Sequence, residues 1–213
     1  MITDEQKGYI QHLSGSIELP EDGSLIKTAY NHLVRSQGAS GSTQSSIEDF
    51  SFAKEAQGVS LIGLSDSIGV TLPHPSSSLP YLTEGGEAKI YFDRSHVVKL
   101  NSGVFYQDWI DFLCSVLVHN CLFPVTQYDL LGFCKGEKEV AAVLSQVYVR
   151  CDQATFLPLV EEYLSGMGFL RERRNDYYHS GLNLVLEDMH DENVLIREGY
   201  LFFIDTVFYF RDQ

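Results

Sequence analysis

The sequence predicts an α+β fold in which a helical N-terminal part precedes a strand-rich part. Residues 1–72 carry apolar side chains at helical spacing. Residues 79–150 contain five apolar stretches of strand length, and residues 151–213 add one helical stretch and a hairpin. Between these parts stand Pro73, Pro75 and Pro80, which exclude helix and central strand. We therefore expect an N-terminal helical extension of residues 1–72, followed by a five-stranded antiparallel sheet.

Three helices are expected in the first part. Thr3 and Gln6 have the spacing of a capping box before the first helix. Gly38 is expected to end the second helix, and a polar linker is expected over residues 36–46. The third helix is expected to run from Ser45 to Gly58.

The second part alternates strands and helices. The strands are expected at 82–92, which the glycines at 85 and 86 divide in two, and at 96–100, 130–134 and 140–150. An amphipathic helix is expected over residues 102–119. A later helix over about 156–165 has Thr155 as its expected cap.

Composition narrows the partners. The 213 residues include 29 acidic and 15 basic side chains, giving a formal charge of -14, with 44% hydrophobic residues. Such a surface repels phosphate backbones and anionic membranes, so neither nucleic acid nor a membrane is an expected partner. The acidic N-terminus does not resemble a signal peptide, and the four cysteines are expected to be buried free thiols. We therefore expect a cytoplasmic protein.

The most informative motif lies near the C-terminus. Asp188 and Asn193 enclose the loop Asp-Met-His-Asp-Glu-Asn, and Asp205 follows twelve residues after Asn193. Between them, residues 194–197 and 200–204 read as the two strands of a hairpin with Glu198-Gly199 as the turn. This spacing is typical of the magnesium-and-phosphate site of kinases, where the loop orients the attacking hydroxyl and supplies one metal ligand.

Two other interpretations use the same residues. The stretch could be a polar loop between two strands of another α+β protein. Alternatively, His190 with Asp188, Asp191 and Glu192 could form the metal-ligand cluster of a hydrolase. The hydrolase hypothesis explains neither Asn193 nor Asp205.

With these motifs, the order of elements resembles the protein-kinase-like fold. Gly85 and Gly86 look like its glycine-rich phosphate loop, and Lys99 looks like the phosphate-binding lysine of its third strand. Gln146 and Tyr148 fall where its adenine-contacting hinge would lie. The loop is similar to that of aminoglycoside phosphotransferase-type kinases, and the whole most resembles the compact kinase module of polyvalent proteins of phages and mobile elements.

The resemblance implies a fold with two lobes and an ATP- and Mg²⁺-dependent phosphotransferase. Residues 79–150 would form the N-lobe and residues 151–213 a reduced C-lobe. Asp188 would orient the hydroxyl of a protein or small-molecule acceptor. Asn193 and Asp205 would hold the metal. Gly85, Gly86, Lys99, Gln146 and Tyr148 would bind the nucleotide.

The sequence also departs from that family's pattern. Thr83 and Ala88 stand at two of the three loop-glycine positions, and no glutamate lies between Lys99 and residue 137, although Asp108 or Asp111 could replace it. Only eight residues follow Asp205, so we expect that a partner chain or residues 1–72 complete the C-lobe. A pseudokinase, which binds a nucleotide or a partner without turnover, therefore stays an alternative.

One basic cluster stands out in this acidic sequence. It consists of Arg171, Arg173 and Arg174. These side chains could belong to a solvated turn or to a subsite for an anionic substrate.

Overall fold

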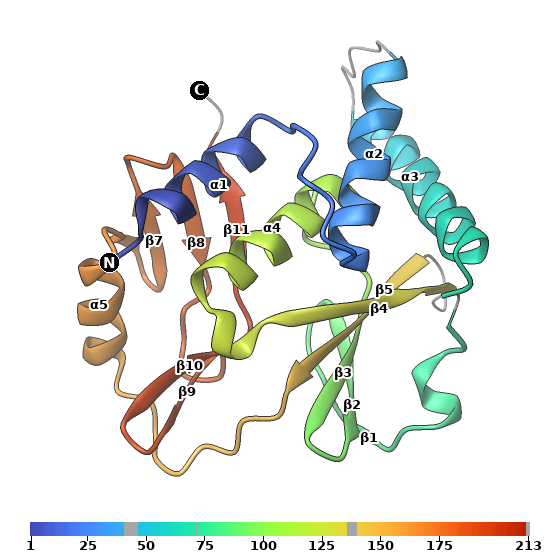
Figure 1. Cartoon of the computed structure of the whole chain (residues 1–213). Helices are drawn as coiled ribbons and strands as arrows, with labels where there is room; N and C mark the ends of the chain where they lie inside the picture. Colours follow the sequence, from blue (N-terminus) through green and yellow to red (C-terminus); the bar gives the residue numbers. More distant parts are fainter. Residues whose placement is uncertain (41–46, 71, 136–139, 212–213) are drawn as a thin grey trace. The chain divides into compact units, whose positions relative to one another are not determined.

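The computed structural model describes residues 1–40, 47–70, 72–135 and 140–211. In these residues the fold is mixed α+β, with five α-helices and three antiparallel sheets (Figure 1). The expected α+β class is therefore confirmed, whereas the division into two lobes stays a prediction. The chain packs as two compact units, of which one comprises residues 1–17, 114–127 and 149–213 and the other residues 18–113 and 128–148. A separate extension of residues 1–72 remains a prediction, as do the boundaries at 79–150 and 151–213.

The larger sheet confirms the expected five antiparallel strands. Its spatial order is β1 (Tyr81–Glu84), β2 (Ala88–Asp93), β3 (His96–Asn101), β5 (Val140–Val147) and β4 (Tyr128–Lys135). Tyr91, Val98, Leu100 and Val143 pack in one buried cluster with Leu72 at its border. Because side chains alternate across a strand, Lys99 points to the opposite face from Val98 and Leu100.

Two helices pack against this sheet. Helix α2 (Leu25–Ser40) contacts β4, and α3 (Ile47–Ser67) contacts β4 and β5 (Figure 1). The expected ends at Gly38 and Gly58 are wrong. A Cβ on Gly58 would lie 3.1 Å from Val140 Cγ2 and 3.3 Å from Trp109 Nε1, so this glycine permits close packing inside the helix. The expected helix start at Ser45 and residues 41–46 of the expected linker lie outside the described residues.

The N-terminal helix belongs to the other unit. Helix α1 (Asp4–Ser14) begins with the predicted capping box, since Gln6 N–H donates to Thr3 Oγ1 over 3.2 Å and Thr3 N–H donates to Gln6 Oε1 over 3.0 Å. Gln6 Nε2 also donates to the Cys121 carbonyl over 2.6 Å. Gln6, the third helical residue and the second member of the capping box, therefore anchors α1 to the end of α4 as well as helping to start it.

Helix α4 (Trp109–Leu122) starts later than the expected residue 102. Asp108 Oδ1 accepts a hydrogen bond from Asp111 N–H over 2.9 Å, so Asp108 caps the helix, and its Oδ2 accepts one from Gln57 Nε2 over 3.1 Å. The helix is followed by a 3₁₀ turn, η2 (Pro124–Thr126), and another of the same length, η1 (Pro75–Ser77), precedes β1. One of the points at which the chain passes between the two units falls within α4.

The unit that contains the C-terminus holds more strands than the sequence predicted. Its four-stranded sheet has the order β11 (Val207–Phe210), β8 (Leu184–Glu187), β7 (Asp176–His179) and β6 (Leu170–Arg173). Helix α5 (Leu157–Gly166) contacts β6, and a separate hairpin pairs β9 (Val194–Arg197) with β10 (Tyr200–Phe203). Strands β6, β7, β8 and β11 were not predicted.

The cysteines are free thiols, as expected, but their burial differs from the prediction. Cys134 is buried, Cys114 and Cys121 are half-buried, and Cys151 is exposed. Among the described residues, no helix combines the length and apolarity needed to span a membrane.

Candidate functional site

The loop from Asp188 to Asn193 is closed by hydrogen bonds between its two ends. Asn193 Nδ2 donates to the Asp188 carbonyl over 2.9 Å and to Asp188 Oδ2 over 3.2 Å. Asp188 has a φ of 65°, in the left-handed region that costs a non-glycine residue about 1 kcal/mol or more. Because both Asn193 donors point at Asp188, the amide oxygen Oδ1 is turned away from this contact, where it can serve as a ligand.

His190 lies inside this turn. Its Nδ1 accepts a hydrogen bond from Glu192 N–H over 3.2 Å, and its Nε2 lies 3.4 Å from Asp188 Oδ2. Both ring nitrogens therefore face the loop itself. In the part of the chain that the structure describes, no three His, Cys, Asp or Glu side chains gather into a metal-ligand group. The arrangement favours a turn-stabilising histidine over the ligand cluster of a hydrolase.

The β9–β10 hairpin brings Asp205 to the same loop. The Glu198-Gly199 turn has φ values of 52° and 79°, as a tight two-residue hairpin turn requires, and Phe203 pairs with Val194. At the open end, Ile204 N–H donates to the Asn193 carbonyl over 2.9 Å. Asp205, which is half-buried, is the next residue. Backbone and side-chain hydrogen bonds thus link Asp188 to Asn193, and Asn193 to the residue that precedes Asp205.

A buried histidine on α4 holds the residue after Asp205. His119 is fully buried; its Nε2 lies 2.9 Å from the Thr126 carbonyl oxygen and its Nδ1 lies 2.7 Å from Thr206 Oγ1. A carbonyl only accepts, so Nε2 carries the hydrogen, and in the neutral ring Nδ1 accepts from the Thr206 hydroxyl. Ser115 Oγ accepts a second bond, from Phe208 N–H, over 2.9 Å. The sequence analysis missed these contacts, because partners 87 and 93 positions apart leave no local pattern.

Two residues before α5 anchor the loop and its hairpin. Thr155 Oγ1 donates to the Val194 carbonyl, and Asp152 Oδ2 accepts from Glu198 N–H over 2.8 Å. The prediction that Thr155 caps α5 is wrong: the cap is Phe156, and it makes no side-chain cap bond. Thr155 instead positions the first residue of β9.

The other unit carries the predicted phosphate-binding residues. Lys99 is 4% exposed, its Nζ donates to Tyr128 Oη over 3.3 Å, and the same atom lies 5.1 Å from the centre of the Tyr128 ring. A buried ammonium is weakly screened by water and salt, so it attracts an anion more strongly than a surface lysine does.

Gly85 and Gly86 lie in the β1–β2 turn of this unit. Gly85 N–H donates to the Ala88 carbonyl over 2.9 Å, which closes the turn. A Cβ on Gly86 would lie 3.0 Å from Phe105 Cζ, whereas a Cβ on Gly85 would meet nothing within 4 Å. A side chain at position 86 would therefore press against Phe105, whereas position 85 has room for one.

Gln146 and Tyr148 lie at the end of β5 and just beyond it. Gln146 is buried and pairs with Val97 on β3 and Tyr128 on β4. Tyr148 N–H donates to the Ser95 carbonyl over 2.9 Å, and its ring packs edge-on against Phe92 at 5.2 Å. A purine base at this segment would therefore use backbone groups other than the Tyr148 N–H.

These groups fit magnesium and a nucleotide. An amide oxygen at Asn193 and a carboxylate at Asp205 are hard oxygen ligands of the kind that Mg²⁺ prefers, and Mg²⁺ keeps several waters and phosphate oxygens besides one or two protein ligands. A buried lysine suits the phosphates. The donor set contains no thiolate and no paired histidines, which a zinc site would use.

Comparison with known families supports a kinase. A family model described as a serine/threonine/tyrosine kinase found in polyvalent proteins matches residues 54–212. The match covers all of the residues discussed in this section. Neither the curated proteins nor the solved structures give a match to the chain.

Proposed function

Because the chain belongs to the kinase family found in polyvalent proteins, we propose that it transfers the γ-phosphate of ATP to a hydroxyl group of a protein, with Mg²⁺ as cofactor. The observation that carries this proposal is the closed loop, in which Asn193 Nδ2 is bound to Asp188 and the Asn193 carbonyl to the residue before Asp205. The family's description gives serine, threonine and tyrosine as the acceptor class.

Each side chain has a role in the proposed reaction. Asp188 orients the acceptor hydroxyl and accepts its proton, while Asn193 Oδ1 and the Asp205 carboxylate would hold the metal. The Lys99 ammonium binds the α- and β-phosphates below the Gly85-Gly86 turn, and the hinge segment of Gln146 and Tyr148 meets the base. Bound Mg²⁺ supplies charge neutralisation on the β- and γ-phosphates. The protein therefore contributes mainly positioning and electrostatic stabilisation.

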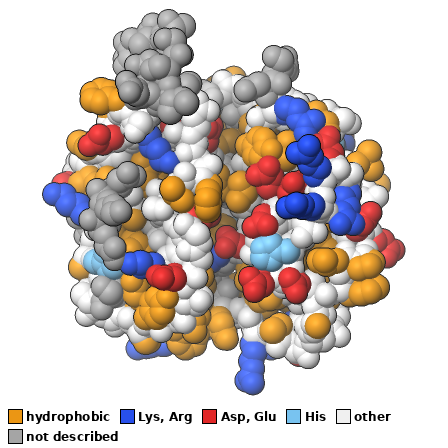
Figure 2. Space-filling view, turned by 180° about the vertical axis from the view of Figure 1, so that it is seen from behind, with side chains coloured by type: hydrophobic (Ala, Val, Ile, Leu, Met, Phe, Trp, Pro, Cys, Tyr) orange, Lys and Arg blue, Asp and Glu red, His pale blue; other side chains and the backbone are white. Residues whose placement is uncertain are grey.

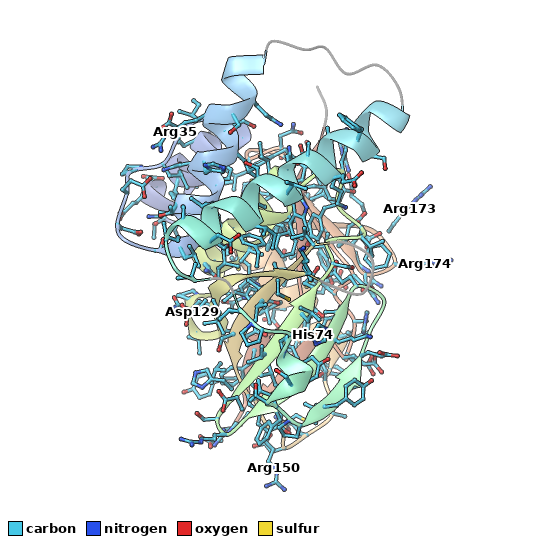
Figure 3. The ribbon with its side chains drawn as sticks, turned by 90° about the vertical axis from the view of Figure 1, so that its right-hand side faces the viewer. Arg35, His74, Asp129, Arg150, Arg173 and Arg174 are labelled. Carbon is cyan, nitrogen blue, oxygen red and sulfur yellow. The ribbon has the colours of Figure 1, made fainter. Side chains whose placement is uncertain are left out.

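Replacing one carboxylate tests the metal-binding role. Asp205→Asn keeps the shape of the side chain but removes its charge, so phosphotransfer from γ-labelled ATP should fall by about 10²–10³-fold, the loss typical for removing one electrostatic group from an active site. The matched control is Asp129→Asn, which makes the same change at an exposed position of β4 (Figure 3). Equal activity of Asp205→Asn and the control would refute the assignment.

A pseudokinase remains the second candidate, because two backbone donors expected to face the nucleotide are engaged within the protein. These are the N–H groups of Gly85 and Tyr148. A thermal-shift titration separates the two functions. An active kinase at an ATP concentration of about 100 times its Kd gains about 2.7 kcal/mol and also turns over. A nucleotide-binding pseudokinase gains the stability without phosphotransfer, and a partner-binding one gains neither.

A further inference from the structure

The turn between β6 and β7 carries two arginines in an unusual setting. Arg173 pairs with Asp176, so Arg174 and Asn175 form a two-residue turn. Arg174 has a φ of 40°, in the left-handed region, where glycine would be unstrained and a larger side chain is not. The sequence therefore keeps a cation at a position that local backbone energetics would assign to glycine.

This turn is hydrogen-bonded to the loop that holds Asp188. Met189 N–H donates to the Asn175 carbonyl over 2.9 Å, and Asp188 N–H donates to Asp176 Oδ1 over 3.2 Å. Asn175 and Asp176, which bind Met189 and Asp188, therefore follow the two arginines directly in the chain. Figure 2 shows basic side chains gathered beside a group of acidic side chains that surround a histidine, on the right of the view.

The charges near the turn leave these two arginines available. Arg171 is engaged, since its Nη1 lies 3.1 Å from Glu161 Oε2 and its Nε donates to the Arg174 carbonyl. Glu172, the nearest acidic neighbour in sequence, forms an ion pair with Arg211. Within the described residues, neither Arg173 nor Arg174 forms an ion pair, and both side chains extend into solvent (Figure 3).

We propose that Arg173 and Arg174 bind the carboxylates of an acidic peptide segment and thereby deliver a neighbouring hydroxyl to Asp188. The inference rests on the proposed function and names its substrate class. A guanidinium group presents a planar pair of donors that matches a carboxylate. The chain carries a net charge of -14, so an acidic segment is repelled by most of the surface and attracted at this turn. Nucleic acid is the poorer ligand, since its binding proteins neutralise several phosphates, commonly six to ten, where this turn offers two cations.

Binding can be measured without turnover. The probe is a fluorescent peptide with an alanine at the acceptor position, flanked by aspartates, and the comparison peptide has glutamines in their place. The test variant is Arg173→Gln with Arg174→Gly. The control is Arg150→Gln, an exposed arginine of the same unit that projects elsewhere (Figure 3). Fluorescence anisotropy should show that the test variant binds the acidic peptide about threefold to tenfold more weakly, as expected for two exposed charge pairs, whereas the control binds as wild type does.

Two further readouts separate recognition from a structural role. The melting temperature of Arg174→Gly should equal or exceed that of wild type, because glycine relieves the left-handed backbone. The affinity of wild type for the acidic peptide should fall as NaCl rises from about 50 to about 300 mM, while the weak binding of the glutamine peptide stays constant. With peptides that carry a serine, the double variant should raise KM and leave kcat unchanged.

Three results would overturn the inference. Wild type could bind the acidic and glutamine peptides equally, or the test variant could bind the acidic peptide as tightly as wild type does. The third is binding of a single-stranded oligonucleotide, in place of the peptide, that is lost in the test variant. The outcome is independent of phosphotransfer. Asp205→Asn should lower turnover by about 10²–10³-fold yet bind the acidic peptide normally, so a failure of the proposed function and a failure of this inference give different results.

Discussion

The contact between Thr206 and His119 gives a direct test of how Asp205, the proposed metal-binding aspartate, is positioned. In Thr206→Val a methyl group replaces the hydroxyl that donates to His119 Nδ1 over 2.7 Å. The two side chains have nearly the same shape, so the change removes one hydrogen bond and little packing. It leaves Nδ1 as a buried acceptor without its donor, next to the backbone that carries Asp205.

The expected cost follows from burial. His119 is 0% exposed and Thr206 6% exposed, so water cannot replace the missing donor. Leaving a buried acceptor unsatisfied costs about 1–3 kcal/mol of unfolding free energy. For a chain of this size each kcal/mol lowers the melting temperature by about 2–4 °C, so a cost of about 2 kcal/mol predicts a drop of about 4–8 °C.

Urea denaturation and a magnesium-nucleotide titration together measure the effect. Thr206→Val should lower the urea midpoint without changing the slope, and it should reduce the stabilisation by ATP and Mg²⁺ because Asp205 is less well held. Thr206→Ser keeps the hydroxyl and should retain most of both. If the valine variant matched wild type in stability while the serine variant lost it, the methyl packing would matter and the hydrogen bond would not.

Two other predictions concern single positions. Gly132→Ala should destabilise the protein by about 3 kcal/mol in urea denaturation, because its φ is 154° and a Cβ there would lie 2.3 Å from the Val70 carbonyl oxygen. Gly63→Ala, inside α3 and with nothing within 4 Å of its Cβ, should instead stabilise by about 0.5–1 kcal/mol. An equal effect of the two substitutions would contradict the argument. Burial lowers the pKa of His179, which packs edge-on against Phe169, so the folded state binds fewer protons than the unfolded state below the ordinary pKa of 6.5. Stability should therefore decrease as the pH falls from 7 to 5, and His179→Gln should flatten that dependence in thermal scans. An unchanged slope in the variant would show that other groups cause the pH dependence.

The hairpin beside the candidate site was predictable because its signals are local. Residues 194–197 and 200–203 are apolar and rich in β-branched or aromatic side chains, and Glu198-Gly199 supplies the two left-handed residues of a tight turn. The capping box of α1 was predictable for the same reason, since Thr3 and Gln6 meet within one helical turn. Both predictions depend on residues at most a few positions apart.

Strand β6 was missed because it lacks that local signal. All four residues of β6 are exposed, and Leu170 is its only apolar residue, so no alternation marks the strand. Gly58 caused the opposite error, a helix that was predicted to end too early. In isolation a glycine indicates a helix end, whereas here α3 continues to Ser67 because Val140 and Trp109 occupy the space beside it. In each case tertiary packing decided the element.

The geometry of Asp188 explains why the loop can be predicted as a motif and yet depends on distant groups. Its left-handed backbone is unfavourable in isolation and is held on both sides: Asp176 accepts from its N–H, and Asn193 donates to its carbonyl and to Oδ2. One side of Asp188 is thus tied to the arginine turn and the other to the proposed metal ligand. The proposed role of Asp188, which is to orient an acceptor hydroxyl toward a phosphate, requires restraint from both directions. The spacing of Asp188 and Asn193 reveals only one of these restraints.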